Sequence, residues 1–170
     1  MSAAPVIDSR GGAETRRKGE RATTSPDFSI PLRASASPRE PFSVRFAGYA
    51  SVFDRVDRGG DVVRRGAFAA SLVERRAVPL LWQHRPGAVI GAIETLAEDA
   101  RGLRVVARVT HPVAAKLVAA GALTGLSFGY RVQASRGGNP RELVALDLAE
   151  VSLVAAPMQP LARVIQVEAT

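Results

Sequence analysis

The chain has 170 residues, of which 46% are hydrophobic and 23% charged, and its formal net charge is +7. These values are typical of a single globular domain with a hydrophobic core. Because the chain contains no cysteine, disulfides, thiolate catalysis and cysteine-based zinc sites are excluded. No apolar run approaches the roughly 18 residues that span a bilayer, so we expect no membrane partner.

The excess of positive charge favours an acidic partner or nucleic acid. Nearly all the cations are arginines, and they are scattered along the chain rather than gathered in a stripe with aromatic residues. We therefore do not expect nucleic-acid binding. Salt-sensitive binding to DNA would be the sign of that alternative.

The composition divides the chain into two parts. Residues 1–40 are rich in serine, arginine, alanine, glycine and proline and hold few large apolar side chains. Such a segment cannot bury enough surface to offset its ordering entropy, so it is predicted to be a flexible tail. Residues 41–170 are predicted to form the folded domain.

The first half of this domain begins with a strand. Alternating β-branched and aromatic residues predict a strand at 42–53, followed by a turn at 57–61. A helix is predicted over 66–76, with Phe68, Leu72 and Val73 on one face. A short buried strand at 79–83 follows.

The second half is also predicted to be rich in strands. One helix, starting at Pro112 and ending near Gly121, interrupts them. The total of six or seven short strands and two helices, mostly joined by tight turns, predicts a mixed or antiparallel sheet that curls into a barrel. The predicted fold class is mainly β with flanking helices (α+β). The predicted strands lie at 88–96, 103–109, 126–133, 142–154 and 164–167.

His84 is the stronger of two histidines as a candidate for chemistry. It follows the apolar run 79–82 and precedes a turn, which places an imidazole at a strand end within reach of solvent. An imidazole titrates near neutral pH, so it can accept a hydroxyl proton and return it to a leaving amine. A purely structural histidine fits the same spacing and is the more common outcome. His111, just before a helix, is interpreted as a cap.

Ser127 lies in the segment 123–130, Leu-Thr-Gly-Leu-Ser-Phe-Gly-Tyr. Strand alternation places its large apolar side chains on one face, and Ser127 and Gly129 on the other. Gly125 and Gly129 are expected to leave room for the backbone of a peptide substrate. An ordinary strand serine beside a glycine bulge is the alternative interpretation and the more common outcome. The serine is expected on an extended strand, unlike the strand-to-helix nucleophile elbow of other hydrolases.

Glu150 is the candidate acid. Alternation places it on the same face as Leu146 and Leu148, and a carboxylate on an apolar face needs a partner. An imidazole N–H is suitable, because the pairing would fix the tautomer of His84 and stabilise its imidazolium form. The alternatives are a side chain turned to solvent, and Asp147 as the acid in place of Glu150.

Four short blocks follow one another between residues 44 and 164. Each is weakly specific alone, but all four in this order resemble the prohead proteases of HK97-type tailed phages and their relatives in gene transfer agents. The blocks are Gly-Tyr-Ala-Ser-Val-Phe at 48–53 with Asp57, Gly60-Asp61 and Gly66-Ala-Phe68; Pro-Leu-Leu-Trp-Gln-His at 79–84; Gly-Ala-Leu-Thr-Gly-Leu-Ser-Phe-Gly-Tyr at 121–130; and Asp-Leu-Ala-Glu-Val-Ser-Leu-Val at 147–154, with Pro157 and Pro-Leu-Ala-Arg at 160–163.

The resemblance implies a catalytic pair and a fold. The histidine of the second block and the serine of the third are the catalytic residues in that family, which correspond here to His84 and Ser127. The acid before Val-Ser-Leu, here Glu150, is implied as the third member. The order His, Ser, third residue is also similar to that of herpesvirus assembly proteases, which implies a small closed or partly closed β-barrel.

The resemblance also implies a function. It is that of a serine endopeptidase that cleaves the scaffold and the major capsid protein inside the assembling prohead, in the cytoplasm of the bacterial host. No metal or cofactor is expected. The alternative is a catalytically inactive scaffold or capsid-assembly module with the same fold. Assembly into a homo-oligomer is compatible with the sequence.

Overall fold

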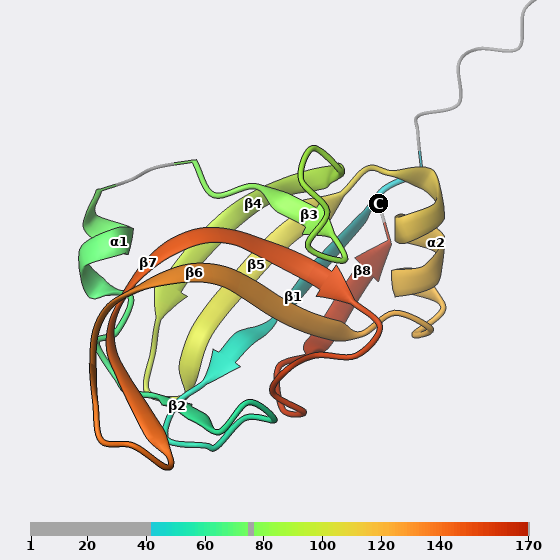
Figure 1. The fold of residues 1–170 in the computed structure, drawn as a ribbon. Coiled ribbons are helices and arrows are strands. Elements are labelled where there is room, and N and C mark those ends of the chain that lie inside the picture. Colours follow the sequence, from blue (N-terminus) through green and yellow to red (C-terminus); the bar gives the residue numbers. More distant parts are fainter. Residues whose placement is uncertain (1–41, 75–76, 170) are drawn as a thin grey trace, which may run out of the picture. The chain divides into compact units, whose positions relative to one another are not determined.

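In a computed structural model, the described residues 42–74 and 77–169 contain eight strands and two short helices (Figure 1). The predicted mainly β class with flanking helices is confirmed. The predicted tail at 1–40 lies outside the described residues and stays a prediction. The elements are β1 (Val44–Val52), β2 (Asp61–Val63), α1 (Ala69–Val73), β3 (Leu80–Trp82), β4 (Val89–Glu98), β5 (Gly102–Val109), α2 (Pro112–Ala119), β6 (Gly125–Arg136), β7 (Arg141–Val154) and β8 (Val164–Ala169).

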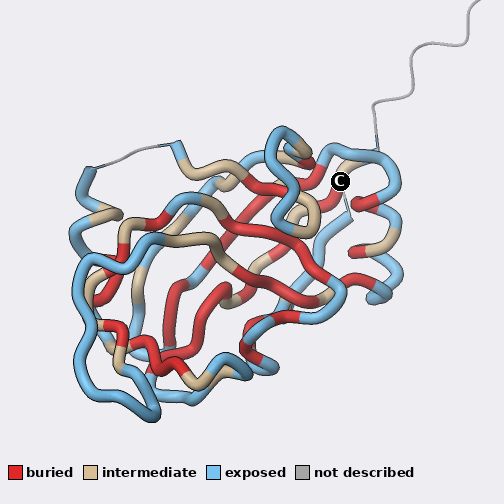
Figure 2. Tube along the Cα trace, in the orientation of Figure 1, coloured by how far each residue is buried: buried red, intermediate tan, exposed pale blue. Residues whose placement is uncertain are grey.

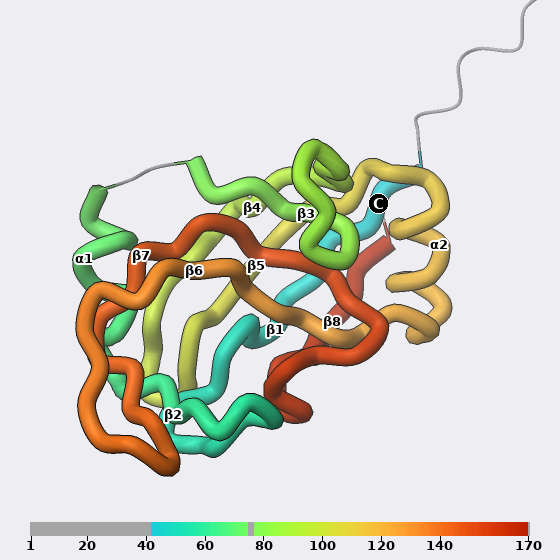
Figure 3. The backbone as a smooth tube through the Cα atoms, in the orientation of Figure 1, coloured from blue at the N-terminus to red at the C-terminus, as the bar shows by residue number. Residues whose placement is uncertain are grey.

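All eight strands belong to one mixed sheet, in the order β2-β7-β3-β4-β5-β1-β8, with β6 paired to β7 outside this path. β7 runs parallel to β2 and β3, and the other pairs are antiparallel. The sheet curls until the start of β6 meets the segment before β8 (Figure 3). There Gly125 bridges Arg163, and the Leu126 N–H donates to the Ala162 carbonyl at 2.9 Å. This contact partly closes the barrel, as the sequence predicts.

The hydrophobic core lies inside the curled sheet, and Figure 2 shows the buried positions concentrated on its strands. The strand predicted at 103–109 is confirmed as β5, and four alternating residues on it are fully buried: Leu103, Val105, Ala107 and Val109. The helix α2 packs near β1 and β8 and buries its small side chains: Ala114, Ala115 and Val118. Barrel and helix therefore share one core.

The helix α1 is shorter than predicted. It spans five residues, and the predicted end at 75–76 lies outside the described residues. Phe68 is fully buried and Leu72 is half-buried, but Val73 is 79% exposed, so its predicted place on the buried face is wrong. Positions i and i+4 share one helix face, and position i+5 turns away from it.

The strand β2 was not predicted, because its three residues follow directly on a turn signal. It exists through parallel pairing with β7, in which Asp61 is opposite Arg141 and Val63 is opposite Leu143. A three-residue strand that pairs with a segment so much later in the chain shows no alternation of its own from which it could be predicted. The strand matters for the candidate site, because Asp61 and Val63 line a cavity that His84 and Ser127 also line.

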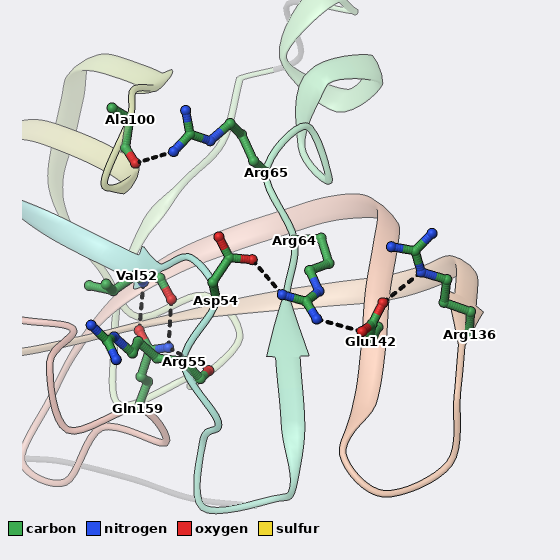
Figure 4. Close-up of polar contacts among 9 residues, drawn as sticks. All are labelled: Val52, Asp54, Arg55, Arg64, Arg65, Ala100, Arg136, Glu142 and Gln159. Atoms are coloured by element: carbon green, nitrogen blue, oxygen red, sulfur yellow. Dashed lines mark hydrogen bonds and ion pairs between the residues drawn. The ribbon is translucent and has the colours of Figure 1, made fainter.

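A chain of ion pairs connects the end of β2 with the β6–β7 hairpin (Figure 4). Arg64 donates to Asp54 Oδ1 at 2.7 Å and to Glu142 Oε1 at 2.5 Å. Arg136 donates to the second oxygen of Glu142 at 2.6 Å. Hydrogen bonds from Arg64 and then Arg136 lower the pKa of Glu142 to about 2.

Glu142→Gln should therefore change how the free energy of unfolding depends on pH. Because the folded-state pKa lies below the ordinary value of 4.5, the carboxylate stabilises the fold above about pH 4.5. That contribution is lost as the pH falls toward about 2. We expect the wild type to have the higher urea midpoint at neutral pH, and the two midpoints to converge in acid. A constant difference at every pH would contradict this assignment.

Candidate active site

His84 lies directly after β3, where the chain leaves the sheet. Gln83 and His84 have φ values of 51° and 58°, a left-handed conformation that non-glycine residues seldom adopt. The Gln83 N–H donates to the Leu153 carbonyl at 3.0 Å, so this turn is attached to β7. The His84 side chain is 44% exposed. The predicted imidazole at a solvent-accessible strand end is therefore found.

His84 and Glu150 lie in direct contact, although 66 residues separate them in sequence. The Nδ1 atom of His84 is 2.6 Å from Oε1 of Glu150, whose side chain is largely buried. A neutral imidazole in this contact donates its Nδ1–H to the carboxylate and leaves Nε2 as an acceptor. The arrangement thus selects the tautomer that a general base needs.

Glu150 lies on a different face from the one predicted. The β6–β7 register shifts after the pair Gly129–Glu150, which leaves Ala149 as an extra residue in a β-bulge. The bulge breaks the alternation, so Glu150 does not share the face of Leu148. It lies instead beside Ser152, whose hydroxyl donates to Glu150 Oε2 at 2.5 Å. The carboxylate therefore has polar partners rather than an apolar surrounding.

Ser127 lies directly opposite Ser152 in the β6–β7 pairing, and only 8% of it is exposed. Residues directly opposite on antiparallel strands have Cβ atoms about 4.5–5.5 Å apart. Because the Ser152 hydroxyl also accepts the backbone N–H of His84 at 3.1 Å, Ser127 lies one side chain away from the His84 turn.

Ser127 and His84 line the same cavity, which has a volume of about 160 Å³. The sheet therefore brings the two predicted reactive side chains to one place. The remaining wall comes from β1, β2, β6 and the loops after β1 and β7: Ala50, Ser51, Asp57, Asp61, Val63, Leu126, Phe128, Tyr130, Met158 and Gln159.

Another part of this wall carries an ion pair. Arg141 donates to both oxygens of Asp61, at 2.8 and 2.6 Å, and the Tyr130 hydroxyl lies 3.4 Å from Asp61. The hydrogen bonds from Arg141 lower the pKa of the Asp61 carboxyl, whereas burial raises the pKa of the Tyr130 phenol. Asp61 is therefore a charged, fixed group of the wall.

The two glycines near Ser127 make room for protein atoms. A Cβ on Gly129 would lie 2.6 Å from Glu150 Oε1, and a Cβ on Gly125 would lie 2.9 Å from Pro157 Cδ. The expectation that both glycines leave open space for a substrate backbone is therefore wrong. Gly129 instead allows the Glu150 carboxylate to lie over β6.

The remaining candidates lie elsewhere. Asp147 is opposite Arg131 in the β6–β7 register and lines a separate hollow with Ser71 of α1. His111 Nδ1 accepts the backbone N–H of Ala114 at 3.4 Å, which confirms the predicted helix cap. The fold thus brings Glu150, and not Asp147, to the imidazole.

In residues 42–74 and 77–169, no three histidine, aspartate or glutamate side chains are grouped so as to hold a metal ion. Neither helix of that part of the chain has the length and apolar character needed to cross a membrane.

The sequence profile of caudovirus prohead serine proteases matches residues 29–170. The chain belongs to this family. The match spans the blocks that contain His84, Ser127 and Glu150, and it confirms the resemblance noted from the sequence.

The prohead protease of Enterobacteria phage HK97 is 39% identical to the chain over 94 residues. The aligned stretch covers 51% of this chain and 42% of the phage protein, so it spans less than half of the relative.

Two solved herpesvirus structures are also similar. KSHV protease, solved with a hexapeptide phosphonate inhibitor, has a TM-score of 0.48 and 14% identity and covers 74% of this chain and 65% of its own. Varicella-zoster virus protease has a TM-score of 0.47 and 14% identity, with coverages of 75% and 64%.

In this prohead protease family member, Ser152 contacts both Glu150 and the backbone of His84, but the sequence interpretation did not name it as a candidate. A signal was available, because residues two apart on a strand share a face, and Ser152 follows Glu150 by two. The bulge at Ala149 leaves this relation intact, since it precedes both residues.

Proposed function

We propose that this chain is a serine endopeptidase with Ser127 as nucleophile, His84 as general base and Glu150 as the acid that orients the imidazole. The observation that carries the proposal is the 2.6 Å contact between His84 Nδ1 and Glu150 Oε1, made beside a cavity that Ser127 also lines. Membership of the prohead serine protease family supports the same chemistry.

The proposed reaction is acyl transfer in two steps. The Nε2 atom of His84 takes the proton of the Ser127 hydroxyl as its oxygen attacks the peptide carbonyl carbon. Collapse of the tetrahedral intermediate breaks the C–N bond, and His84 gives its proton to the leaving amine. His84 then takes a proton from water as the water oxygen attacks the ester carbon. Collapse of this second tetrahedral intermediate breaks the ester C–O bond, and His84 gives its proton to the Ser127 oxygen. Glu150 stabilises the imidazolium in both steps.

The proposed substrates are the scaffold segment and the N-terminal part of the major capsid protein. The reaction would take place inside the assembling prohead, in the cytoplasm of the bacterial host. Support comes from the family and from the HK97 relative, whose name is prohead protease.

Co-expression of this chain with the major capsid protein of the same genome tests the proposal. We expect the capsid protein to be shortened by the wild type and to stay full-length with Ser127→Ala or His84→Ala. Removal of either triad member typically leaves about 10³- to 10⁴-fold catalysis over water, far below enzyme rates. Gel mobility and mass of the capsid product give the readout.

His111→Gln is the matched control, because it changes the other histidine, which caps α2 away from the cavity. It should shorten the capsid protein as the wild type does. Identical capsid bands with wild type, Ser127→Ala and His84→Ala would refute the peptidase and favour a catalytically inactive scaffold or capsid-assembly module.

A further inference from the structure

Ser152 is a fully buried serine whose hydroxyl lies between two parts of the proposed machinery. Its Oγ donates to Glu150 Oε2 at 2.5 Å and accepts the backbone N–H of His84 at 3.1 Å. An amide N–H can only donate, and a carboxylate can only accept. The single hydroxyl proton is therefore directed at Glu150.

These contacts close a ring of hydrogen bonds. The ring runs from the backbone of His84 through Ser152 to Glu150, and from the second carboxylate oxygen back to His84 Nδ1 at 2.6 Å. It fixes the imidazole relative to its own main chain. It also holds a left-handed residue, since His84 has a φ of 58°. Such strain persists where surrounding contacts over-determine it.

The Glu150 carboxylate has little freedom on its other side. A Cβ on the facing Gly129 would lie 2.6 Å from Oε1 and 3.0 Å from Cγ of Glu150. The side chain is thus packed against the β6 backbone, with one oxygen on Ser152 and the other on His84. Loss of the Ser152 hydroxyl would release one of the two hydrogen bonds that set the carboxylate plane.

We propose that Ser152 is the positioning residue of the proposed triad, which holds Glu150 so that its Oε1 faces His84 Nδ1. The inference rests on the proposed function. Ser152 has no contact with the reacting bond and takes up no proton in the reaction. Its hydroxyl supplies a charge-assisted hydrogen bond, the kind roughly twice as strong as a neutral one.

Steady-state cleavage of a capsid-derived peptide tests this role. Ser152→Ala should lower kcat by about 10- to 100-fold and leave KM near the wild-type value, because a hydrogen bond to a charged group contributes about 1.5–3 kcal/mol. Ser152→Thr retains the hydroxyl and should recover most of kcat. Ser152→Cys keeps the size but has only a weak donor, so it should stay close to Ser152→Ala.

Ser71→Ala is the matched control. The Ser71 hydroxyl also accepts a backbone N–H from β7, that of Leu148 at 2.8 Å, but it lies on α1 away from the cavity. This variant should keep the wild-type kcat. If Ser152→Ala and Ser71→Ala reduce kcat equally, or if Ser152→Ala keeps the wild-type kcat, the proposal is overturned.

A second readout separates this inference from the proposed function. In proton NMR spectra, the Nδ1–H of His84 should give a downfield, slowly exchanging signal, assigned with His111→Gln because the chain has two histidines. The signal should be lost in Ser152→Ala and kept in Ser71→Ala. If the wild type shows the signal but cleaves no capsid protein, and Ser152→Ala loses the signal, the peptidase is refuted and the positioning role stands. An unchanged signal in Ser152→Ala would refute the positioning alone.

Discussion

Glu150→Gln should reduce kcat/KM by about 10⁴-fold, the loss seen when the acid of a serine-protease triad becomes an amide. A glutamine keeps the shape of Glu150 but presents either an N–H donor or a neutral oxygen to His84 Nδ1. The donor favours the tautomer with Nε2 protonated, which cannot take the Ser127 proton. The loss should appear mainly in kcat, measured on a capsid-derived peptide under saturating conditions.

Asp147→Asn provides the matched control for this prediction. It makes the same carboxylate-to-amide change on the same strand, three residues earlier, but Asp147 lines a separate hollow near α1. We expect kcat/KM to stay close to the wild-type value. If Asp147→Asn were the damaging change and Glu150→Gln the harmless one, Asp147 would be the acid of the site after all.

The main outline of the fold follows from alternation in the sequence. The strands β5 and β6, on either side of α2, lie where the pattern predicts them, because each is long enough to show a period of two. The short strand β2 and the exposed Val73 of α1 were not predicted. The strand β2 exists through tertiary pairing with β7, whereas Val73 turns off the buried helix face because it follows Phe68 by five residues. Elements of five or fewer residues carry too little periodicity to reveal either feature.

The sequence names the residues of the candidate site but not their geometry. His84 and Glu150 meet as expected, yet the face of Glu150 depends on the bulge at Ala149, which nothing in the segment marks. A one-residue insertion reverses every later side chain on a strand, so alternation carried through it gives the wrong face. The left-handed turn at His84 is equally invisible, because it depends on distant contacts with β7.

The role of Gly129 also could not be predicted from the sequence. A glycine in a strand indicates that something approaches closely, but not what approaches. The sequence interpretation assigned the space to a substrate, whereas the Glu150 carboxylate occupies it. The approaching group comes from the neighbouring strand, 21 residues later in the chain, and only the β6–β7 register identifies it.

Phe68→Ala should lower the free energy of unfolding by about 3–5 kcal/mol, the usual cost of truncating a buried phenylalanine. Phe68 is fully buried at the start of α1, and its ring meets that of Phe128 edge-on, with centroids 5.1 Å apart. It also lies 6.4 Å from the ring of Phe53. Urea denaturation should show a lower midpoint with an unchanged slope.

Val73→Ala is the control within the same helix. Because Val73 is largely exposed, its truncation should change the free energy of unfolding by no more than about 0.5 kcal/mol.

Phe68→Ala has a further consequence, since Phe128 is the neighbour of Ser127 on β6 and lines the same cavity. A cavity opened behind Phe128 removes the aromatic support of the strand that carries the proposed nucleophile. We therefore expect folded Phe68→Ala to cleave more slowly than folded Val73→Ala, and equal rates would show that β6 holds Ser127 without this support.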